Sequence, residues 1–375
     1  MKALAKTEKI LLYDRSDPLE LDCGAELPNV EVAFETYGKL NSRATNAILI
    51  FHALSGDAHA AFYHTKDDKK PGWWDFMIGQ GKPFDTEKYF IICANVLGGC
   101  KGSTGPSSTN PDTGKPYGTS FPPITISDML KPQKKLIEYL GIKRLLCTAG
   151  GSMGGMQALQ WAVNYPSSLE GAIIIATSPT HTAQAIAFNS VGRYAILSDP
   201  NWKTGDYYHN GSRPLIGLKT ARMIGHITYL GQLSMEEKFG RKIQEGKGCS
   251  KIDFSKEFEV ESYLQYQGDS FVKRFDPNSY LYITKAIDAF DIYNGKKNLA
   301  QALKNVQAKT MVISFTSDWL YPKEESLKIV KALKINSIDT AYCNIDSPYG
   351  HDSFLVDLPK FKDAVKGFLK ALGDR

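Results

Sequence analysis

The chain has 375 residues, of which 42% are hydrophobic and 23% are charged. This composition supplies a large apolar core and fits one large domain, or one domain with an insertion. Its 45 basic and 40 acidic residues give a formal net charge of +5, which is too diffuse to indicate nucleic-acid binding.

The N-terminal region contains no apolar signal segment, and no stretch approaches the ~18 uninterrupted apolar residues of a membrane span. We therefore expect a cytoplasmic protein with no membrane partner. The six cysteines, at positions 23, 93, 100, 147, 249 and 343, form no C-x-x-C pair, which indicates reduced thiols. His59 and His64 lack the H-E-x-x-H frame of a zinc helix, so no metal site is expected there.

Short apolar runs alternate with helical patterns over much of the chain, and this alternation predicts a parallel sheet covered by helices. The predicted strands are residues 47–51, 89–95, 145–149, 171–176, 310–315 and 341–345. Residues 179–295 differ, because they are polar, rich in tyrosine and helix-forming with little strand alternation. We expect this stretch to be a helical lid inserted into an α/β core that comprises residues 1–178 and 296–375.

The third predicted strand leads into a G-x-S-x-G pentapeptide at residues 150–154, and a helical pattern follows it. In a strand, turn and helix of this kind only glycines flank the serine without collision, and its hydroxyl faces an open cleft. Ser152 is therefore the predicted nucleophile. The alternative is a glycine-rich turn that only starts a helix. A dinucleotide site is excluded because Ser152 occupies the place of the middle glycine.

A serine nucleophile needs a histidine that accepts its proton and an acid that orients the histidine. In hydrolase-type α/β folds these follow in the order Ser, Asp or Glu, His, at strand ends. Asp318 ends the predicted strand 310–315, and His351 is the only late histidine, in a turn-rich loop before a closing amphipathic helix from about residue 353. Asp318 could instead be a helix N-cap, and a lone loop histidine is usually only solvated. The predicted triad is Ser152, Asp318 and His351.

Acyl chemistry also needs two backbone N–H groups directed at the developing oxyanion. Met153, which follows the serine, supplies one of them. The first predicted strand runs into the small-residue loop Phe51-His52-Ala53-Leu54-Ser55-Gly56, and Leu54 is our choice for the second. Without the serine motif, this loop would be an ordinary strand-to-helix connection.

Six segments together resemble the homoserine O-acetyltransferases: residues 51–59, 72–75, 95–106, 150–157, 316–322 and 350–352. The resemblance runs from roughly residue 10 to the end. It implies an α/β-hydrolase fold with a helical lid, a homodimer, and transfer of acetyl from acetyl-CoA to L-homoserine in methionine biosynthesis. No permanently bound cofactor is implied, since acetyl-CoA is a co-substrate.

The resemblance also assigns roles to residues. It makes Ser152 the nucleophile with Asp318 and His351 as its partners, and it makes Arg222 and Asp352 contacts of homoserine. A guanidinium suits the carboxylate of homoserine and a carboxylate suits its ammonium group. Without the resemblance, a lone arginine or aspartate at these positions would be interpreted as a solvated charge.

Such a site predicts ping-pong transfer through an acetyl-serine intermediate. Trp319 and Leu320 are bulky and uncharged, so acetyl is favoured over succinyl, whose second carboxylate requires a cation. The alternatives that remain are a homoserine O-succinyltransferase, an acyltransferase for another hydroxy amino acid, a serine esterase of the same fold, and a non-catalytic binding protein.

Overall fold

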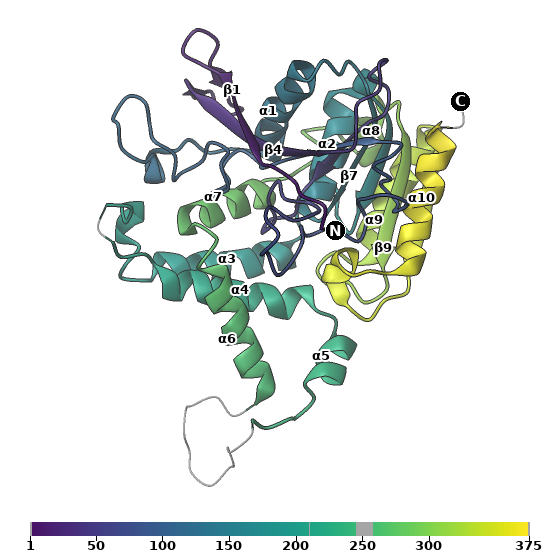
Figure 1. The fold of residues 1–375 in the computed structure, drawn as a ribbon. Helices are drawn as coiled ribbons and strands as arrows, with labels where there is room; N and C mark the ends of the chain where they lie inside the picture. Colours follow the sequence, from purple (N-terminus) through teal and green to yellow (C-terminus); the bar gives the residue numbers. More distant parts are fainter. Residues whose placement is uncertain (1, 210, 245–257, 374–375) are drawn as a thin grey trace.

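In the computed structural model, which describes residues 2–209, 211–244 and 258–373, an eight-stranded sheet runs through the molecule (Figure 1). Its strand order is β1-β4-β6-β5-β7-β8-β9-β10, and β2 and β3 form a separate pair. The strands are β1 (Glu8–Tyr13), β2 (Leu19–Glu20), β3 (Glu26–Leu27), β4 (Val30–Tyr37), β5 (Ala47–Phe51), β6 (Phe90–Ala94), β7 (Leu145–Gly151), β8 (Leu169–Ile175), β9 (Lys309–Phe315) and β10 (Thr340–Ile345).

The sheet is mostly parallel, as predicted. Strands β5 to β10 pair in parallel, and all six predicted strands are among them. The two N-terminal strands β1 and β4 add an antiparallel edge that the sequence analysis did not predict. The carboxyl ends of the parallel strands meet at one edge of the sheet, where the loops after β5, β7 and β9 come together.

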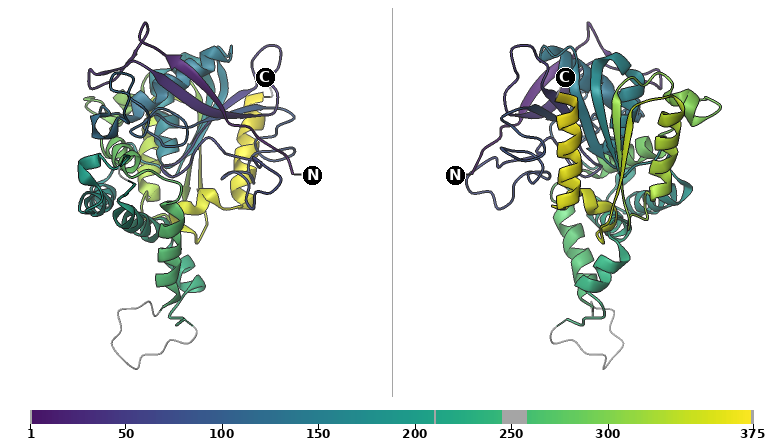
Figure 2. Two further views of the ribbon diagram at one scale, coloured as in Figure 1. Left: turned by 60° about the vertical axis from the view of Figure 1, so that its left-hand side comes forward. Right: turned by 90° about the vertical axis from the view of Figure 1, so that its right-hand side faces the viewer.

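Both faces of the sheet are covered, because successive strand residues point to opposite sides. In β5, Leu49 and Phe51 join the apolar cluster under α1, α2, α8 and α9, whereas Ile48 and Ile50 join the cluster under α10. The right-hand view of Figure 2 shows α10 in yellow on one face and α9 on the other. Burial on both sides explains why the central strands are continuous apolar runs.

The core helices are α1 (Ile126–Tyr139), α2 (Met153–Asn164), α8 (Leu299–Leu303), α9 (Lys323–Ile335) and α10 (Pro359–Gly373). Short 3₁₀ turns lie at η1 (Gly118–Ser120), η2 (Pro166–Ser168), η3 (Lys203–Gly205) and η4 (Gly350–Leu355). The predicted closing helix begins at Pro359 and not at residue 353, so that boundary was wrong. Residues 350–355 form η4 because Ser353 Oγ donates to Gly350 O at 2.6 Å, and proline then occupies the first position of α10.

Between β8 and β9 the described chain forms helices and no strand. We call residues 179–295 the helical insertion. It contains α3 (Ala183–Leu197), α4 (Leu215–Tyr229), α5 (Gln232–Lys238), α6 (Glu259–Phe271) and α7 (Pro277–Asp288). In Figure 1, α3 and α4 lie side by side below the sheet, while α5 and α6 project away from the core. The limits of the lid, at residues 179 and 295, stay a prediction.

Among the described residues, no helix has the length and apolar character needed to cross a membrane. The five cysteines that the structure describes are free, and Cys249 lies outside the described residues.

Candidate active site

Ser152 lies between β7 and α2 in a strained backbone conformation, with φ 60° and ψ −123°. A side chain at positive φ is costly, and such strain often marks functional sites. A Cβ atom at Gly150 would lie 2.4 Å from Gly154 O, and one at Gly154 would lie 2.2 Å from Phe51 O. Glycine at both positions therefore allows the tight turn, and it also lets the start of α2 approach the end of β5.

Asp318 and His351 form a buried pair beside this turn. His351 Nδ1 lies 2.8 Å from Asp318 Oδ2, and the two residues are only 3% and 4% exposed. Because a carboxylate only accepts, the Nδ1–H group donates and Nε2 is left as the basic nitrogen. The other oxygen, Asp318 Oδ1, accepts from the backbone N–H groups of Leu320 at 3.0 Å and Tyr321 at 2.9 Å.

The environment of His351 tunes its basicity. Burial disfavours the charged imidazole, but the charge of Asp318 and its hydrogen bond outweigh burial and raise the pKa of His351 above its usual value. The imidazole is therefore a stronger base than a free histidine. This shift suits a group that must accept a proton from a weakly acidic hydroxyl.

The contact between His351 and Ser152 stays a prediction. Nε2 of His351 is buried and has no hydrogen-bond partner among the residues that the structure describes. The rings of Tyr321 and Tyr229 lie 5.1 and 6.0 Å from the imidazole, and both tyrosines line the cavity that Ser152 also lines. The unpartnered nitrogen thus lies in the neighbourhood of the serine.

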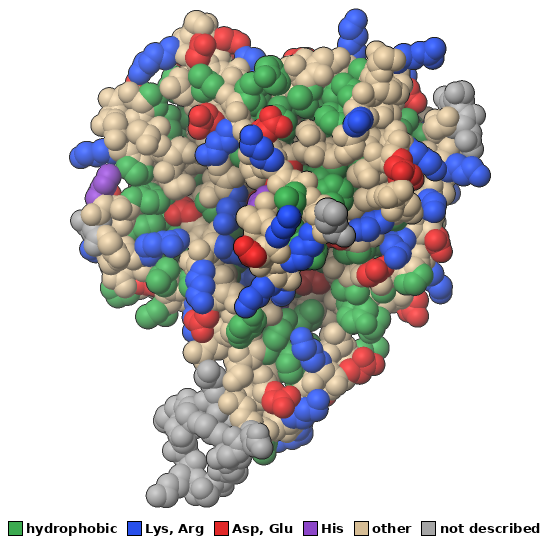
Figure 3. All heavy atoms as spheres, in the orientation of Figure 1, with side chains coloured by type: hydrophobic (Ala, Val, Ile, Leu, Met, Phe, Trp, Pro, Cys, Tyr) green, Lys and Arg blue, Asp and Glu red, His purple; other side chains and the backbone are tan. Residues whose placement is uncertain are grey.

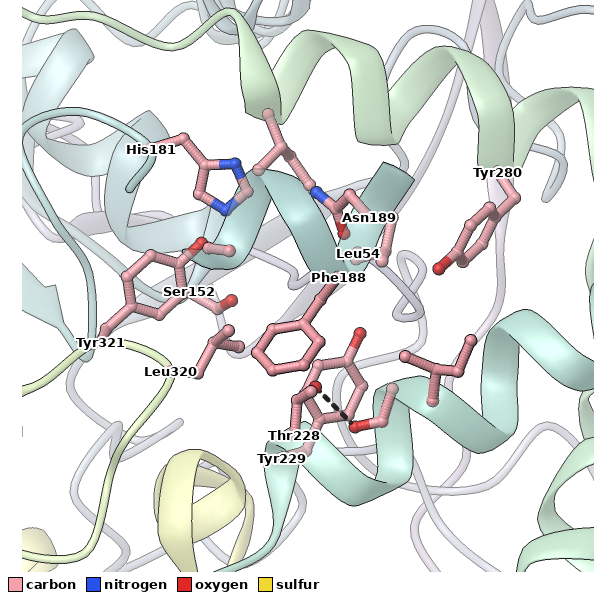
Figure 4. A pocket seen from close by; sticks show the side chains of 14 residues that line it. Leu54, Ser152, His181, Phe188, Asn189, Thr228, Tyr229, Tyr280, Leu320 and Tyr321 are labelled. Carbon is pink, nitrogen blue, oxygen red and sulfur yellow. Dashed lines mark hydrogen bonds between the residues drawn. The ribbon is translucent and has the colours of Figure 1, made fainter. Parts of the chain in front are cut away.

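The cavity at Ser152 is small and mainly apolar. Its volume is about 40 Å³, and core residues Leu54 and Leu320 line it together with Phe188 and Ile224 of the helical insertion. Figure 4 shows Leu320, Phe188 and Tyr321 around this space, with Ser152 behind the tyrosine ring. A space of this size beside the serine suits a small acyl group.

The loop that carries Leu54 is held by its histidine. His52 is 1% exposed, and burial lowers its pKa, which keeps it neutral. Its Nε2 accepts from Val96 N at 3.1 Å, so its Nδ1–H donates to Ala53 O at 2.8 Å. Because the peptide bond is planar and trans, fixing the Ala53 carbonyl also fixes the direction of the Leu54 N–H group.

Leu54 and Ser152 line the same cavity, and Met153 begins α2 directly after the serine. The two predicted oxyanion donors therefore lie on adjoining segments, because Gly154 packs against the end of β5. Their role as oxyanion donors stays a prediction.

Arg222 of α4 and Asp352 of η4 carry opposite charges near the site without an ion pair between them among the described residues. Arg222 Nε is buried and has no hydrogen-bond partner in the described part of the chain, and the guanidinium lies 4.8 Å from the centre of the Phe271 ring. Burial raises the pKa of Asp352, although the positive charges of His351 and Arg222 oppose this shift. A ligand with both an anion and a cation would satisfy both groups.

Arg222 also lines an open cleft of about 490 Å³ next to the Leu54 loop. Ser55, Gly56 and Arg274 form other parts of its wall. Figure 3 shows Lys and Arg side chains gathered on the middle of this face of the molecule, where the loops in front of the sheet approach the helical insertion. A basic cleft beside the site suits anionic substrates.

Sequence reasoning missed a buried charged network at the far side of the small cavity. Asp288 Oδ1 accepts from His181 Nδ1 at 3.0 Å and from Asn189 Nδ2 at 2.8 Å, while Asp288 Oδ2 lies 2.5 Å from Arg193 Nη2. Burial opposes the charge on Asp288, but these partners lower its pKa overall. Asp288 ends α7, whereas its partners lie on α3 and just before it, so no local motif could have predicted the network.

A second missed cluster joins His59 and His64 through Glu35 of β4. Glu35 Oε1 lies 2.7 Å from both His64 Nε2 and Thr7 Oγ1, and Oε2 lies 3.0 Å from His59 Nδ1 and 2.7 Å from Tyr37 Oη. The ligand-type atoms of the two histidines and the glutamate lie within 4.8 Å of one another. Each carboxylate oxygen already accepts two hydrogen bonds, so the cluster is complete as a hydrogen-bonded network. The expectation that no metal binds there stays a prediction.

Comparisons with known proteins identify the fold and the family of the chain. A family model described as the α/β hydrolase fold matches residues 46–358. The chain is 58% identical, over 95% of its length, to a homoserine O-acetyltransferase of Methanohalobium evestigatum, of which it covers 72%. It is also 52% identical to a homoserine O-succinyltransferase of Acidithiobacillus ferrooxidans, over 94% of this chain and 92% of that relative.

Solved structures give the same result for the fold. The crystal structure of homoserine O-acetyltransferase from Bacillus anthracis matches with a TM-score of 0.89 and 32% identity, over 98% of each chain. Esterase E22 matches with a TM-score of 0.88 and 30% identity, over 98% of this chain and 100% of that one. The strained serine elbow, the buried Asp318–His351 pair and these likenesses together show that the chain belongs to the α/β-hydrolase fold family and, within it, to the homoserine O-acyltransferases.

Proposed function

We propose that this protein is a homoserine O-acetyltransferase that transfers acetyl from acetyl-CoA to the side-chain hydroxyl of L-homoserine, as a step of methionine biosynthesis. The observation that carries the proposal is the hydrogen bond between His351 and Asp318 beside the strained Ser152. The names of the relatives support homoserine as the acceptor.

The transfer proceeds in two halves. His351 Nε2 takes the proton of Ser152, and Oγ attacks the thioester carbonyl while the N–H groups of Met153 and Leu54 stabilise the oxyanion. The intermediate collapses, the C–S bond breaks, and His351 returns the proton to the sulfur of coenzyme A. His351 then takes the proton of the homoserine hydroxyl, whose oxygen attacks the acetyl-serine ester. The bond from the acyl carbon to Ser152 Oγ breaks, His351 returns the proton to Oγ, and O-acetyl-L-homoserine leaves free Ser152.

Water competes with homoserine for the acetyl-serine ester, so the acceptor must be well oriented. Arg222 binds the carboxylate of homoserine and Asp352 binds its ammonium group, which gives each unpaired charge a partner. Oriented groups can reach effective molarities of ~10⁵ M or more, enough to favour transfer over hydrolysis. The helical insertion limits the access of water as a lid.

The small cavity favours acetyl over succinyl. One water-sized probe occupies roughly 10–15 Å³, so a cavity of about 40 Å³ holds a methyl group but leaves little room for a chain that ends in a carboxylate. Leu320 in its wall is uncharged, and the nearby Arg193 is paired with Asp288. The succinyltransferase among the relatives makes succinyl transfer the second candidate.

The deciding experiment is a thiol-release assay with acetyl-CoA or succinyl-CoA and a panel of hydroxy amino acids, with Ser152→Ala as the inactive control. We expect coenzyme A release that depends on homoserine and on acetyl-CoA. Comparable turnover with succinyl-CoA would contradict the acetyl assignment, dependence on another acceptor would contradict homoserine, and equal release without any amino acid would indicate an esterase.

We also propose a cytoplasmic homodimer. Large apolar side chains are exposed on the helical insertion, among them Tyr194 and Ile216, each 73% exposed, and a second copy would cover them. Light scattering checks the mass in solution. A monomer at all concentrations would contradict the dimer.

A further inference from the structure

The loop that carries Leu54 is contacted by a cation of the helical insertion. Arg274, three residues after the end of α6, donates from Nη1 to the backbone carbonyl of Ser55 at 2.7 Å. Ser55 directly follows Leu54. This hydrogen bond therefore joins the insertion to the core loop at the residue next to the proposed oxyanion donor.

Two peptide groups carry the effect of this contact to Leu54. The carbonyl of Ser55 and the N–H of Gly56 belong to one planar peptide, and that N–H donates to Ala53 O at 2.9 Å. The carbonyl of Ala53 and the N–H of Leu54 belong to the next planar peptide in this path. Since the structure has no cis peptide bond in its described part, each N–H points opposite to its carbonyl. Arg274 thus stabilises the turn whose geometry directs the Leu54 N–H group.

Arg274 is itself held in place. Its guanidinium lies 5.2 Å from the centre of the Phe271 ring, and Arg222 lies 4.8 Å from the same ring. Two residues along, Asp276 N donates to Cys100 Sγ at 3.3 Å, and the Asp276 carboxylate accepts from Tyr207 Oη at 2.7 Å. The arginine therefore reaches the loop from a backbone that is anchored to Cys100 of the core and to Tyr207 of the insertion, with its side chain supported by an aromatic face.

The guanidinium is not engaged elsewhere in the described residues by an ion pair within 4 Å. An exposed arginine without an ion-pair partner would usually extend its guanidinium into water. Here its hydrogen bond to a carbonyl is charge-assisted and therefore stronger than a neutral one. The contact is thus suited to holding a loop in a defined geometry.

We infer that Arg274 is a positioning residue, which acts through the Ser55 carbonyl to keep the Leu54 N–H directed at the acyl oxygen. The inference rests on the proposed acyl-transfer function and deepens it. The hydrogen bond from Arg274 connects the helical insertion to the oxyanion donor. Because Arg274 and Arg222 both contact the ring of Phe271, this hydrogen bond also lies beside Arg222. Loss of one oxyanion donor typically lowers kcat about 10²- to 10³-fold. Loss of the hydrogen bond that supports this donor has a smaller effect, and we expect kcat to fall about 10- to 100-fold.

The test compares Arg274→Met, which removes the donor, with Arg274→Lys, which keeps a charged donor. Lys273→Gln is the matched control, because Lys273 is the neighbouring exposed cation. Each variant is assayed for homoserine-dependent acetyl transfer and for hydrolysis of p-nitrophenyl acetate, a small ester without phosphate or carboxylate. Circular dichroism melting verifies the fold.

We expect Arg274→Met to lower kcat about 10- to 100-fold in both reactions, with KM for homoserine and the melting temperature little changed. Arg274→Lys should recover part of the rate, and Lys273→Gln should match the wild type. If Arg274→Met does not fold, Arg274→Gln, whose shorter and uncharged side chain loses the charge-assisted hydrogen bond to Ser55 O, provides the kcat comparison.

Two results would overturn the inference. An increase confined to KM for acetyl-CoA, with ester hydrolysis unchanged, would make Arg274 a substrate-binding cation. A lower melting temperature with unchanged kcat would give it a structural role only. Because ester hydrolysis is measured without homoserine, these results are distinct from a failure of the proposed function, which would appear as wild-type enzyme without homoserine-dependent thiol release.

Discussion

The core and the helical insertion meet at Ser152 and contribute different physical features to the site. The core supplies a strained serine and a buried, hydrogen-bonded Asp318–His351 pair at the ends of parallel strands. The insertion supplies apolar walls and two arginines, Arg222 and Arg274, that face a cleft without ion-pair partners in the described part of the chain. In our proposal the core therefore creates reactivity and binds the ammonium group of the acceptor through Asp352, while the insertion binds its carboxylate through Arg222 and excludes water.

The largest expected effect tests the core. Asp318→Asn preserves the shape of the residue but removes the charge that orients and stabilises the His351 imidazolium. We expect kcat to fall about 10³- to 10⁴-fold, with little change in KM for homoserine. Steady-state kinetics with both substrates measures this. A loss below tenfold would show that Asp318 is not the partner of a catalytic histidine.

The next effect tests the insertion. Arg222→Ala removes the group that we expect to bind the acceptor carboxylate, and a hydrogen bond to a charged group contributes about 1.5–3 kcal/mol. KM for homoserine should therefore rise roughly 10- to 100-fold. Hydrolysis of acetyl-CoA without homoserine should stay unchanged. Equal losses of transfer and hydrolysis would contradict a role that is restricted to the acceptor.

The pH profile of the reaction tests the catalytic base that the core supplies. Its raised pKa keeps His351 protonated to a higher pH than a free histidine, and only the neutral form accepts a proton. The acidic limb of kcat/KM should therefore have its midpoint above 6.5, the ordinary value for histidine. A midpoint below 6.5 would contradict the hydrogen-bonded pair.

The smallest effect on activity concerns the cluster of Glu35, His59 and His64. Burial opposes the charge on Glu35, but hydrogen bonds from both histidines, Thr7 and Tyr37 lower its pKa to about 2. Its contribution to stability is therefore present above pH 4.5 and is lost as the pH falls towards 2. The pKa of His59 is raised despite burial, mainly by Glu35, so its contribution is present below pH 6.5 and declines as the pH rises through the raised value.

Glu35→Gln should lower the free energy of unfolding by roughly 1–3 kcal/mol at neutral pH, because two histidines lose a charged partner, while kcat changes little. Thermal melting at several pH values measures the loss. A variant with wild-type stability at pH 6 would contradict the account of this cluster. A large loss of kcat would instead connect the cluster to the site.

The predictability of the two regions differs for a physical reason. The elbow and Asp318 could be located from sequence because each follows a continuous apolar strand, and strand ends converge in a parallel sheet. His351 could be located because it is the only histidine that follows Asp318 in the chain. The antiparallel strand β1 was missed because it is only partly buried and has a weaker apolar pattern. The start of α10 was misplaced because side-chain hydrogen bonds of Ser353 form a 3₁₀ turn before Pro359.

Contacts that join distant segments could not be predicted from local patterns. Glu35 reaches His59 and His64 across the sheet edge, and Asp288 reaches His181 across the insertion. Arg274 lies 219 residues along the chain from Ser55. No spacing rule connects such pairs, and only the folded chain shows them.

The central claim is that Ser152 carries the acyl group between the two substrates, and mass spectrometry of peptides tests it most directly. After incubation with acetyl-CoA and no homoserine, the peptide that contains Ser152 should gain the mass of one acetyl group on the serine, and homoserine should then remove it as O-acetyl-L-homoserine. Sustained transfer to homoserine with no acetyl group on Ser152 at any time, or undiminished transfer by Ser152→Ala, would contradict the account.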